Sequence, residues 1–174
     1  QYMYWYASDM DDYDGGHGTH MASSSCGANI DASNSAFNGM APNAKLAFWD
    51  IGDAQGGLAM PSDMSMMFLP GKAAGAHIFS GSWGSTENIN SQSTTVLDRY
   101  SYSSDDEFLG IFACGNEGQE GYFSVGDPAF AKNALTVGAH ESNWNFAKFG
   151  MLDTAKWRTA HQTNMAYFSS MGPT

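Results

Sequence analysis

The first side chains that could do chemistry are two histidines set among small residues, in residues 15–22, which read G-G-H-G-T-H-M-A. A helix is predicted to begin at His17, directly after Gly15 and Gly16, and these small neighbours leave the imidazole open to a second chain. A neutral imidazole takes up a proton near pH 7, so His17 is a candidate general base. The alternatives are a pair of surface histidines, or a metal-binding pair formed with His20 on the same helical face.

A second candidate is a carboxamide that follows an apolar strand. Residues 109–114, which read L-G-I-F-A-C, predict a buried strand, and Asn116 comes shortly after it. Ligands bind at the carboxyl ends of strands in α/β folds, and an Asn side chain can donate to a developing oxyanion. The alternative is an ordinary turn residue, because Asn beside Gly is common in turns.

A third candidate lies at the end of another predicted strand, residues 76–80. Residues 80–84, S-G-S-W-G, come close to the nucleophile elbow G-x-S-x-G, with Ser80 in place of the first glycine. An elbow needs a helix directly after it, whereas residues 86–93 are polar and typical of a loop. We therefore expect an extended segment that pairs with a substrate strand through backbone hydrogen bonds.

The scaffold that would position these candidates alternates helices and strands. Helices are predicted at residues 17–25, 62–74 and 94–103, and strands at residues 45–51, 76–80, 109–114, 134–138 and 166–169. Residues 139–164 show no clear period and are predicted to form a long surface loop. The alternation favours right-handed βαβ units, in a mostly parallel sheet covered by helices on both faces. The sequence thus predicts an α/β fold in one domain.

The composition excludes several classes of function. The chain has 174 residues, with 7 Lys plus Arg against 18 Asp plus Glu and a net charge of -11. Such an acidic chain is a poor partner for nucleic acid or for an anionic membrane surface, and no apolar run is long enough for a membrane segment. The two cysteines, Cys26 and Cys114, are too few for a disulfide scaffold and lack metal-binding spacing. The aspartates of residues 9–14 predict a solvated acidic loop, with calcium binding as the weaker alternative.

Six motifs, in a fixed order, resemble those of the subtilisin-like serine proteases (subtilases, peptidase S8 type). They are residues 17–20 (H-G-T-H), 39–44 (G-M-A-P-N-A), 82–84 (S-W-G), 113–118 (A-C-G-N-E-G), 129–139 (A-F-A-K-N-A-L-T-V-G-A) and 168–174 (F-S-S-M-G-P-T). The resemblance implies a subtilisin-like three-layer sandwich, with helices on both faces of a mostly parallel sheet. It also implies a serine-type endopeptidase that cleaves peptide bonds through an acyl-enzyme.

The resemblance assigns roles to individual residues. His17 would be the base of the catalytic triad and Asn116 the oxyanion donor, whereas His20 matches a structural histidine of the family. A polypeptide substrate would bind as an extended strand along Ser82, Trp83 and Gly84. The resemblance further implies a monomer that is extracellular or in the secretory pathway. No cofactor or metal is needed for catalysis, and structural calcium stays open.

Two members of the triad lack a match in these residues. The family order is Asp, then His, then Ser, but no D-[ST]-G motif precedes His17 and no matching serine follows it. We therefore expect residues 1–174 to be a central fragment, a partial peptidase domain without the N-terminal Asp-bearing strand and the C-terminal Ser-bearing helix, and inactive alone. One alternative is a catalytically dead subtilase-like pseudoprotease that only binds. Another is a metal hydrolase that uses His17 and His20.

Overall fold

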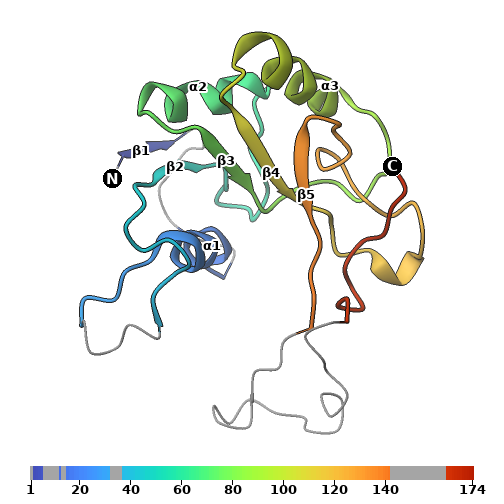
Figure 1. Cartoon of the computed structure of the whole chain (residues 1–174), viewed down its shortest axis with the longest axis horizontal. Coiled ribbons are helices and arrows are strands. Elements are labelled where there is room, and N and C mark those ends of the chain that lie inside the picture. Colours follow the sequence, from blue (N-terminus) through green and yellow to red (C-terminus); the bar gives the residue numbers. More distant parts are fainter. Residues whose placement is uncertain (1, 6–11, 13–14, 32–36, 142–163) are drawn as a thin grey trace, which may run out of the picture. The chain divides into compact units, whose positions relative to one another are not determined.

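The computed structural model describes residues 2–5, 12, 15–31, 37–141 and 164–174 (Figure 1). The chain divides into two compact units. The first unit consists of Gln1–Ser82 and Arg99–Gly110, and the second consists of Trp83–Asp98 and Ile111–Thr174. Each unit therefore combines segments that are distant in the sequence.

Helices and strands alternate along the chain (Figure 1). The helices are α1 (His17–Cys26), α2 (Ser65–Ala73) and α3 (Gln92–Arg99), which continues as the π-helical turn η2 (Tyr100–Ser104), and there is a 3-10 turn, η3 (Gly118–Glu120). The strands are β1 (Tyr2–Trp5), β2 (Ala47–Asp50), β3 (Ile78–Gly81), β4 (Leu109–Ala113) and β5 (Ala134–Val137). Strands β1 and β2 pair in parallel, and β3, β4 and β5 are neighbours in that order in a second sheet.

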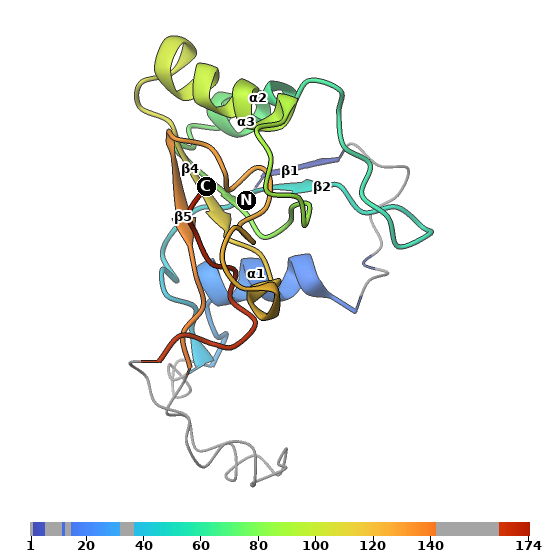
Figure 2. The ribbon, with the colours of Figure 1, turned by 90° about the vertical axis from the view of Figure 1, so that its right-hand side faces the viewer.

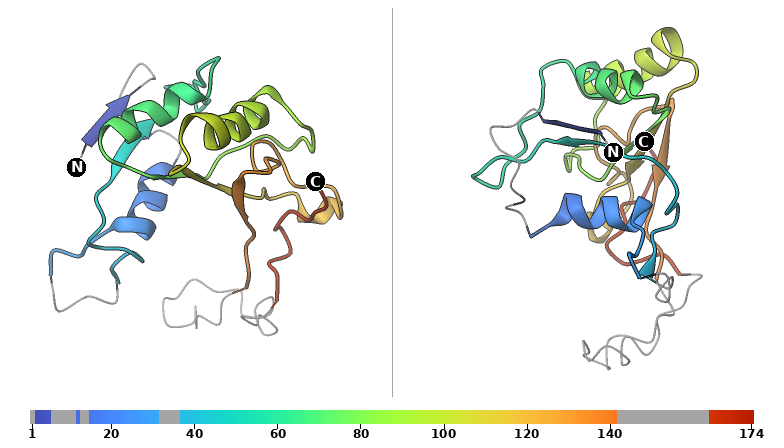
Figure 3. Two further views of the ribbon diagram at one scale, coloured as in Figure 1. Left: turned by 45° about the horizontal axis from the view of Figure 1, so that its top comes forward. Right: turned by 90° about the vertical axis from the view of Figure 1, so that its left-hand side faces the viewer.

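The first unit consists of a sheet between two helical layers. Helices α1 and α2 lie on opposite sides of the β1–β2 sheet (Figures 2 and 3). Helix α1 approaches strand β2 closely at Gly18, where a β-carbon would lie 3.3 Å from the ring of Phe48. The predicted α/β fold, with parallel strands between helical layers, is confirmed.

The core of the first unit is an aromatic cluster around Phe68 of α2, whose side chain is buried. The ring centroid of Phe68 lies 4.9 Å from that of Phe79, 5.0 Å from Tyr100 and 4.7 Å from Phe108. Tilted and edge-on ring pairs at these distances stabilise a core beyond the area that they bury. The cluster therefore joins helix α2 and strand β3 to the segment that contains η2.

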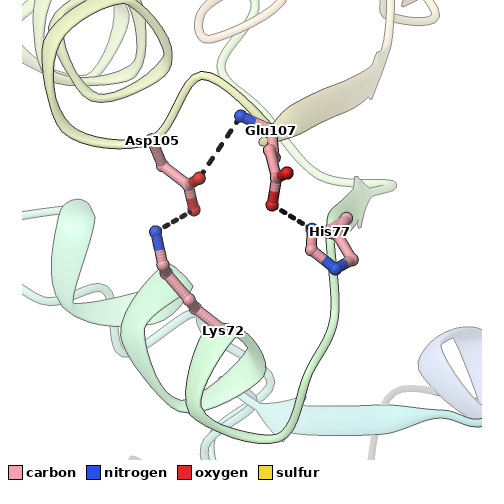
Figure 4. Close-up of polar contacts among 4 residues, drawn as sticks. All are labelled: Lys72, His77, Asp105 and Glu107. Carbon is pink, nitrogen blue, oxygen red and sulfur yellow. Dashed lines mark hydrogen bonds and ion pairs between the residues drawn. The ribbon is translucent and has the colours of Figure 1, made fainter.

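A charged pair lies at the end of the same helix (Figure 4). Lys72 Nζ is 2.6 Å from Asp105 Oδ2, and the Asp105 side chain is only 8% exposed, against 49% for Lys72. The other Asp105 oxygen accepts a hydrogen bond of 3.3 Å from the backbone N–H of Glu107, whose carboxylate lies 3.6 Å from His77 Nδ1. The hydrogen bond between Lys72 and Asp105 lowers the pKa of Asp105 and raises the pKa of Lys72.

We expect this pair to make the stability of the first unit depend on pH at both extremes. The pKa of Asp105 is lowered from 3.8, so its contribution is present above pH 3.8 and is lost as the pH falls through the folded-state pKa. The pKa of Lys72 is raised from 10.5, so its contribution is complete below pH 10.5 and is lost as the pH rises further.

Urea unfolding of the chain and of a Lys72→Met variant should therefore differ most between these two pH values. The difference should shrink at both ends of the range. Lys132→Met is the matched control, because Lys132 is exposed, and it should leave the unfolding midpoint unchanged. A loss in Lys72→Met that is constant across pH would show that packing of the lysine stem, and not charge, is the cause.

The second unit has its own core. Phe112 of β4 and Leu97 of α3 are completely buried, and Val96, Val125 and Ala131 are nearly so. Trp83 packs edge-on against Phe112, with ring centroids 5.6 Å apart and planes at 83°. Burial of large apolar side chains is the main stabilising term in such a core. It fixes the strand that leads to Asn116.

Most predicted elements are confirmed, with three corrections. Helix α2 begins at Ser65, after Met64 and not after Ser62. Residues 166–169 form a turn instead of a strand, because the Ser169 N–H donates to Ala166 O at 2.9 Å. The third correction is strand β1, which the sequence did not predict. Residues 142–163 of the predicted loop lie outside the described residues. No helix in the described segments is both long enough and apolar enough to cross a membrane.

Candidate active site

His17 occupies the first position of α1, and its side chain is exposed. Two glycines set the entry to the helix, since Gly15 has φ 64° and Gly16 has φ 77°, a left-handed conformation that other residues rarely adopt. The Gly16 carbonyl accepts the first helical hydrogen bond, 2.8 Å from the N–H of His20. The glycine pair therefore starts the helix with the imidazole on its surface, as the sequence predicted.

The far end of α1 is fixed by backbone groups from a later segment. The N–H of Met40 donates to Ser24 O at 3.0 Å, and the N–H of Ala41 donates to Ser25 O at 2.8 Å. Carbonyls in the last turn of a helix have no partner within the helix, so these bonds complete the C-terminus. The motif at residues 39–44 thus anchors the helix that carries His17.

No hydrogen bond joins the His17 imidazole to a carboxylate within the part of the chain that the structure describes. Asp12 instead accepts a hydrogen bond of 2.6 Å from the Thr19 hydroxyl. His20 is exposed, and the described residues contain no group of three His, Cys, Asp or Glu side chains that could hold a metal.

The predicted substrate segment, residues 82–84, directly follows strand β3 and is assigned to no helix or strand. Ser82 and Trp83 are half-buried and Gly84 is exposed. No helix follows before α3 begins at Gln92. The absence of a helix over these fully described residues confirms that this motif is not a nucleophile elbow.

Asp127 ties this segment to a second loop of the same unit. Its backbone carbonyl accepts the N–H of Ser85 at 2.8 Å, and its carboxylate accepts the hydroxyls of Ser91 and Thr94. The Asn88 side chain also donates to Val125 O at 2.7 Å. Because α3 begins beside Ser91, one aspartate fixes both the start of a helix and the segment before it.

Gly126 allows these two segments to meet, and we expect Gly126→Ala to destabilise the second unit by about 3 kcal/mol. A β-carbon at this position would overlap the carbonyl oxygen of Ser85, so the backbones would have to separate. Urea unfolding would measure the loss. Gly172→Ala is the matched control, since a β-carbon there meets nothing within 4 Å, and it should change stability by less than about 1 kcal/mol. Equal effects would contradict a close approach at Gly126.

Asn116 lies in the loop that follows β4, and its side chain is exposed. The loop departs from the strand through Gly115, which has φ 113°. The preceding residue, Cys114, is 5% exposed, and its Sγ lies 3.3 Å from the Ser169 hydroxyl. The strand thus ends in a buried anchor and presents the carboxamide at the surface, where it can donate to a ligand.

The site residues are distributed over both units. His17 and Ser82 belong to the first unit, and Trp83, Gly84 and Asn116 belong to the second. Within the second unit, the edge-on contact of Trp83 with Phe112 places the substrate segment beside the strand that leads to Asn116. The structure therefore places Trp83 and Gly84 of the substrate segment, together with the Asn116 loop, around the core of the second unit.

Sequence reasoning overlooked three polar residues that shape the second unit, namely Asp127, Glu117 and Ser170. A D-P pair at residues 127–128 does mark a turn. The residues around Asp127 in the sequence do not indicate that its carboxylate accepts hydrogen bonds from hydroxyls more than thirty residues earlier. Glu117 and Ser170 are 53 residues apart in the sequence, so their contact depends on the fold.

Comparisons with known proteins agree on the family. A model of the subtilase family matches residues 2–174. The protein named serine protease/ABC transporter B family protein tagD, from Dictyostelium discoideum, is 32% identical over 166 residues, which are 90% of this chain and 9% of that protein. The tagB protein of the same organism is 37% identical over 141 residues, 77% of this chain and 7% of that protein. The chain thus spans less than a tenth of the length of these relatives.

Solved structures share the fold. The protease domain of PatA, in a mutant form, has a TM-score of 0.65 and 20% identity, and the match covers 99% of this chain and 55% of that chain. The psychrophilic subtilisin-like protease Apa1 from an Antarctic Pseudoalteromonas has a TM-score of 0.53 and 20% identity, over 76% of this chain and 25% of that one. Since the family model extends over residues 2–174, this chain belongs to the subtilase family.

Proposed function

We propose that the protein containing this chain is a serine-type endopeptidase, with the 174 residues forming part of its catalytic domain. Membership of the subtilase family supports serine peptidase activity in the parent protein. The observation that carries the proposal is the family match over residues 2–174, which includes His17 at the start of α1 and Asn116 after β4.

In the proposed mechanism, a serine hydroxyl attacks the substrate carbonyl and His17 takes up the hydroxyl proton. His17 then gives this proton to the leaving amine, and water releases the acyl group by the same route. An aspartate orients the imidazole. The serine and the aspartate would come from parts of the parent protein beyond these 174 residues.

Asn116 would stabilise the negative charge that develops on the substrate oxygen. As the tetrahedral intermediate forms, its oxygen becomes negative, and the exposed carboxamide of Asn116 can donate a hydrogen bond to it. Ser82, Trp83 and Gly84 would hold a polypeptide in an extended conformation through their backbone groups, because their segment directly follows strand β3 and belongs to no helix.

The test is to express the parent protein and to measure both cleavage of an unfolded protein substrate and labelling by a fluorophosphonate. Cleavage together with labelling of one serine is the expected result, whereas the isolated 174-residue chain should show neither. Peptide binding without labelling would favour the pseudoprotease alternative. Activity that a chelator abolishes, without labelling, would favour a metal hydrolase.

A further inference from the structure

The loop that carries Asn116 is closed by a ring of hydrogen bonds. The backbone N–H of Asn116 donates to Glu117 Oε2 at 2.7 Å, and the Ser170 hydroxyl donates to the same oxygen at 3.2 Å. The Ser170 oxygen in turn accepts the backbone N–H of Glu117 at 3.1 Å. One carboxylate oxygen and one hydroxyl therefore connect the two backbone N–H groups of this turn.

The backbone is built to let these groups approach. A β-carbon on Gly115 would lie 2.5 Å from Glu117 Oε2 and 2.7 Å from Ser170 Oγ, so only glycine leaves them room. The Ser170 N–H also donates to Gly115 O at 3.2 Å, and the Gly118 N–H donates to Phe168 O at 2.8 Å. Ser170 is 7% exposed, so its bonds are largely protected from competing water.

An exposed side chain can stabilise a transition state only if its backbone is already in place. Asn116 follows a strand and belongs to no helix, so α-helical hydrogen bonds do not hold it. Donors to an oxyanion are effective because they need no reorganisation when the charge develops. Hydrogen bonds to a carboxylate are stronger than those between neutral groups, which makes Glu117 an effective tie for the Asn116 backbone.

We propose that Glu117 and Ser170 are positioning residues, which act on catalysis through the backbone of Asn116. This inference rests on the proposed function, because it assigns to Asn116 the oxyanion of a peptidase. The role of Glu117 and Ser170 is to hold the Asn116 backbone in the conformation that directs its carboxamide toward the developing charge.

A double-mutant cycle in the full parent protein tests the proposal, with a chromogenic peptide anilide as the substrate. Glu117→Ala should lower kcat by about 10- to 100-fold with little change in KM, because a small misplacement of a catalytic group has an effect of this size. In an Asn116→Ala background, the same Glu117→Ala change should have almost no further effect, since Glu117 would act only through Asn116.

Two variants provide the controls. Glu117→Gln should restore most of kcat, because both bonds are made to one oxygen and a carboxamide oxygen can accept them. Glu120→Ala changes an exposed carboxylate in the same turn and should leave kcat unchanged. If Glu117→Ala leaves kcat intact, or lowers it equally with and without Asn116, the proposal is overturned.

Hydrogen exchange gives a readout that does not depend on activity. The Asn116 amide should exchange faster in Glu117→Ala than in the wild type, and at close to the wild-type rate in Glu117→Gln. Unchanged exchange in Glu117→Ala would overturn the positioning role even if the parent protein cleaves no peptide. If the parent protein has no peptidase activity but shows the expected exchange pattern, the proposed function is refuted, whereas the role of Glu117 in holding the Asn116 backbone is supported.

Discussion

Replacing His17 with alanine in the parent protein is expected to lower kcat for peptide hydrolysis by about a millionfold, with little change in KM. This is the size of the loss caused by removing the triad histidine of subtilisin itself. In the proposed mechanism no other group would take the serine proton, whereas the proposed substrate segment, residues 82–84, would be unaffected. Steady-state kinetics on a peptide anilide, with active sites counted by fluorophosphonate labelling, would measure the loss.

His20→Ala is the matched control for this change. His20 lies in the same helix, is exposed like His17, and matches a histidine that is structural in the family. Its replacement should leave kcat close to that of the wild type, because His20 takes no part in the proposed proton transfer. Equal losses in the two variants, together with activity that depends on added metal, would contradict the role of His17 as a triad base.

Replacing Asn116 with leucine should lower kcat by about a hundredfold to a thousandfold and leave KM nearly unchanged. This magnitude is that observed when the oxyanion asparagine of subtilisin is removed. Leucine has a similar size but cannot donate a hydrogen bond, so the variant removes an interaction that forms only as the oxygen becomes negative. The same kinetic assay measures the effect.

Gln119→Ala tests whether a neighbouring carboxamide matters. Gln119 is exposed and lies three residues after Asn116 in the same connection, and its loss should be neutral. A rise in KM with an unchanged kcat in Asn116→Leu would indicate that Asn116 binds the ground state of the substrate. That outcome would contradict the oxyanion role.

The elements that could be predicted from the sequence are those with a strong local signal. Helix α1 follows two glycines and ends before a third, and strand β4 is an apolar run of strand length, so both were predicted within about two residues. Strand β1 has an aromatic sequence that suits a strand, but its partner is strand β2, more than forty residues later. Its pairing depends on this distant contact, which no local pattern contains.

At residues 166–169 the sequence predicts a strand, whereas the structure has a turn. Their small and aromatic residues are compatible with a strand, yet their backbone and side-chain groups bond to other segments. Phe168 O accepts the N–H of Gly118, and the Ser169 hydroxyl accepts the N–H of Ala139 at 3.0 Å. Tertiary hydrogen bonds therefore override the local preference. The role of Glu117 could not be predicted for the same reason. Its hydrogen bond to Ser170 is a tertiary contact that the neighbouring residues in the sequence do not indicate.

The anchoring of α1 has a consequence for how this region can change length. The N–H of Gly39 donates to Gly27 O at 2.7 Å, so the chain that leaves the helix returns to the point where it left. The cost in entropy of closing a loop rises only slowly with its length. We therefore expect residues added or removed between these two glycines to leave the end of α1 in place, because the hydrogen bond from Gly39 to Gly27 joins the two ends of the connection.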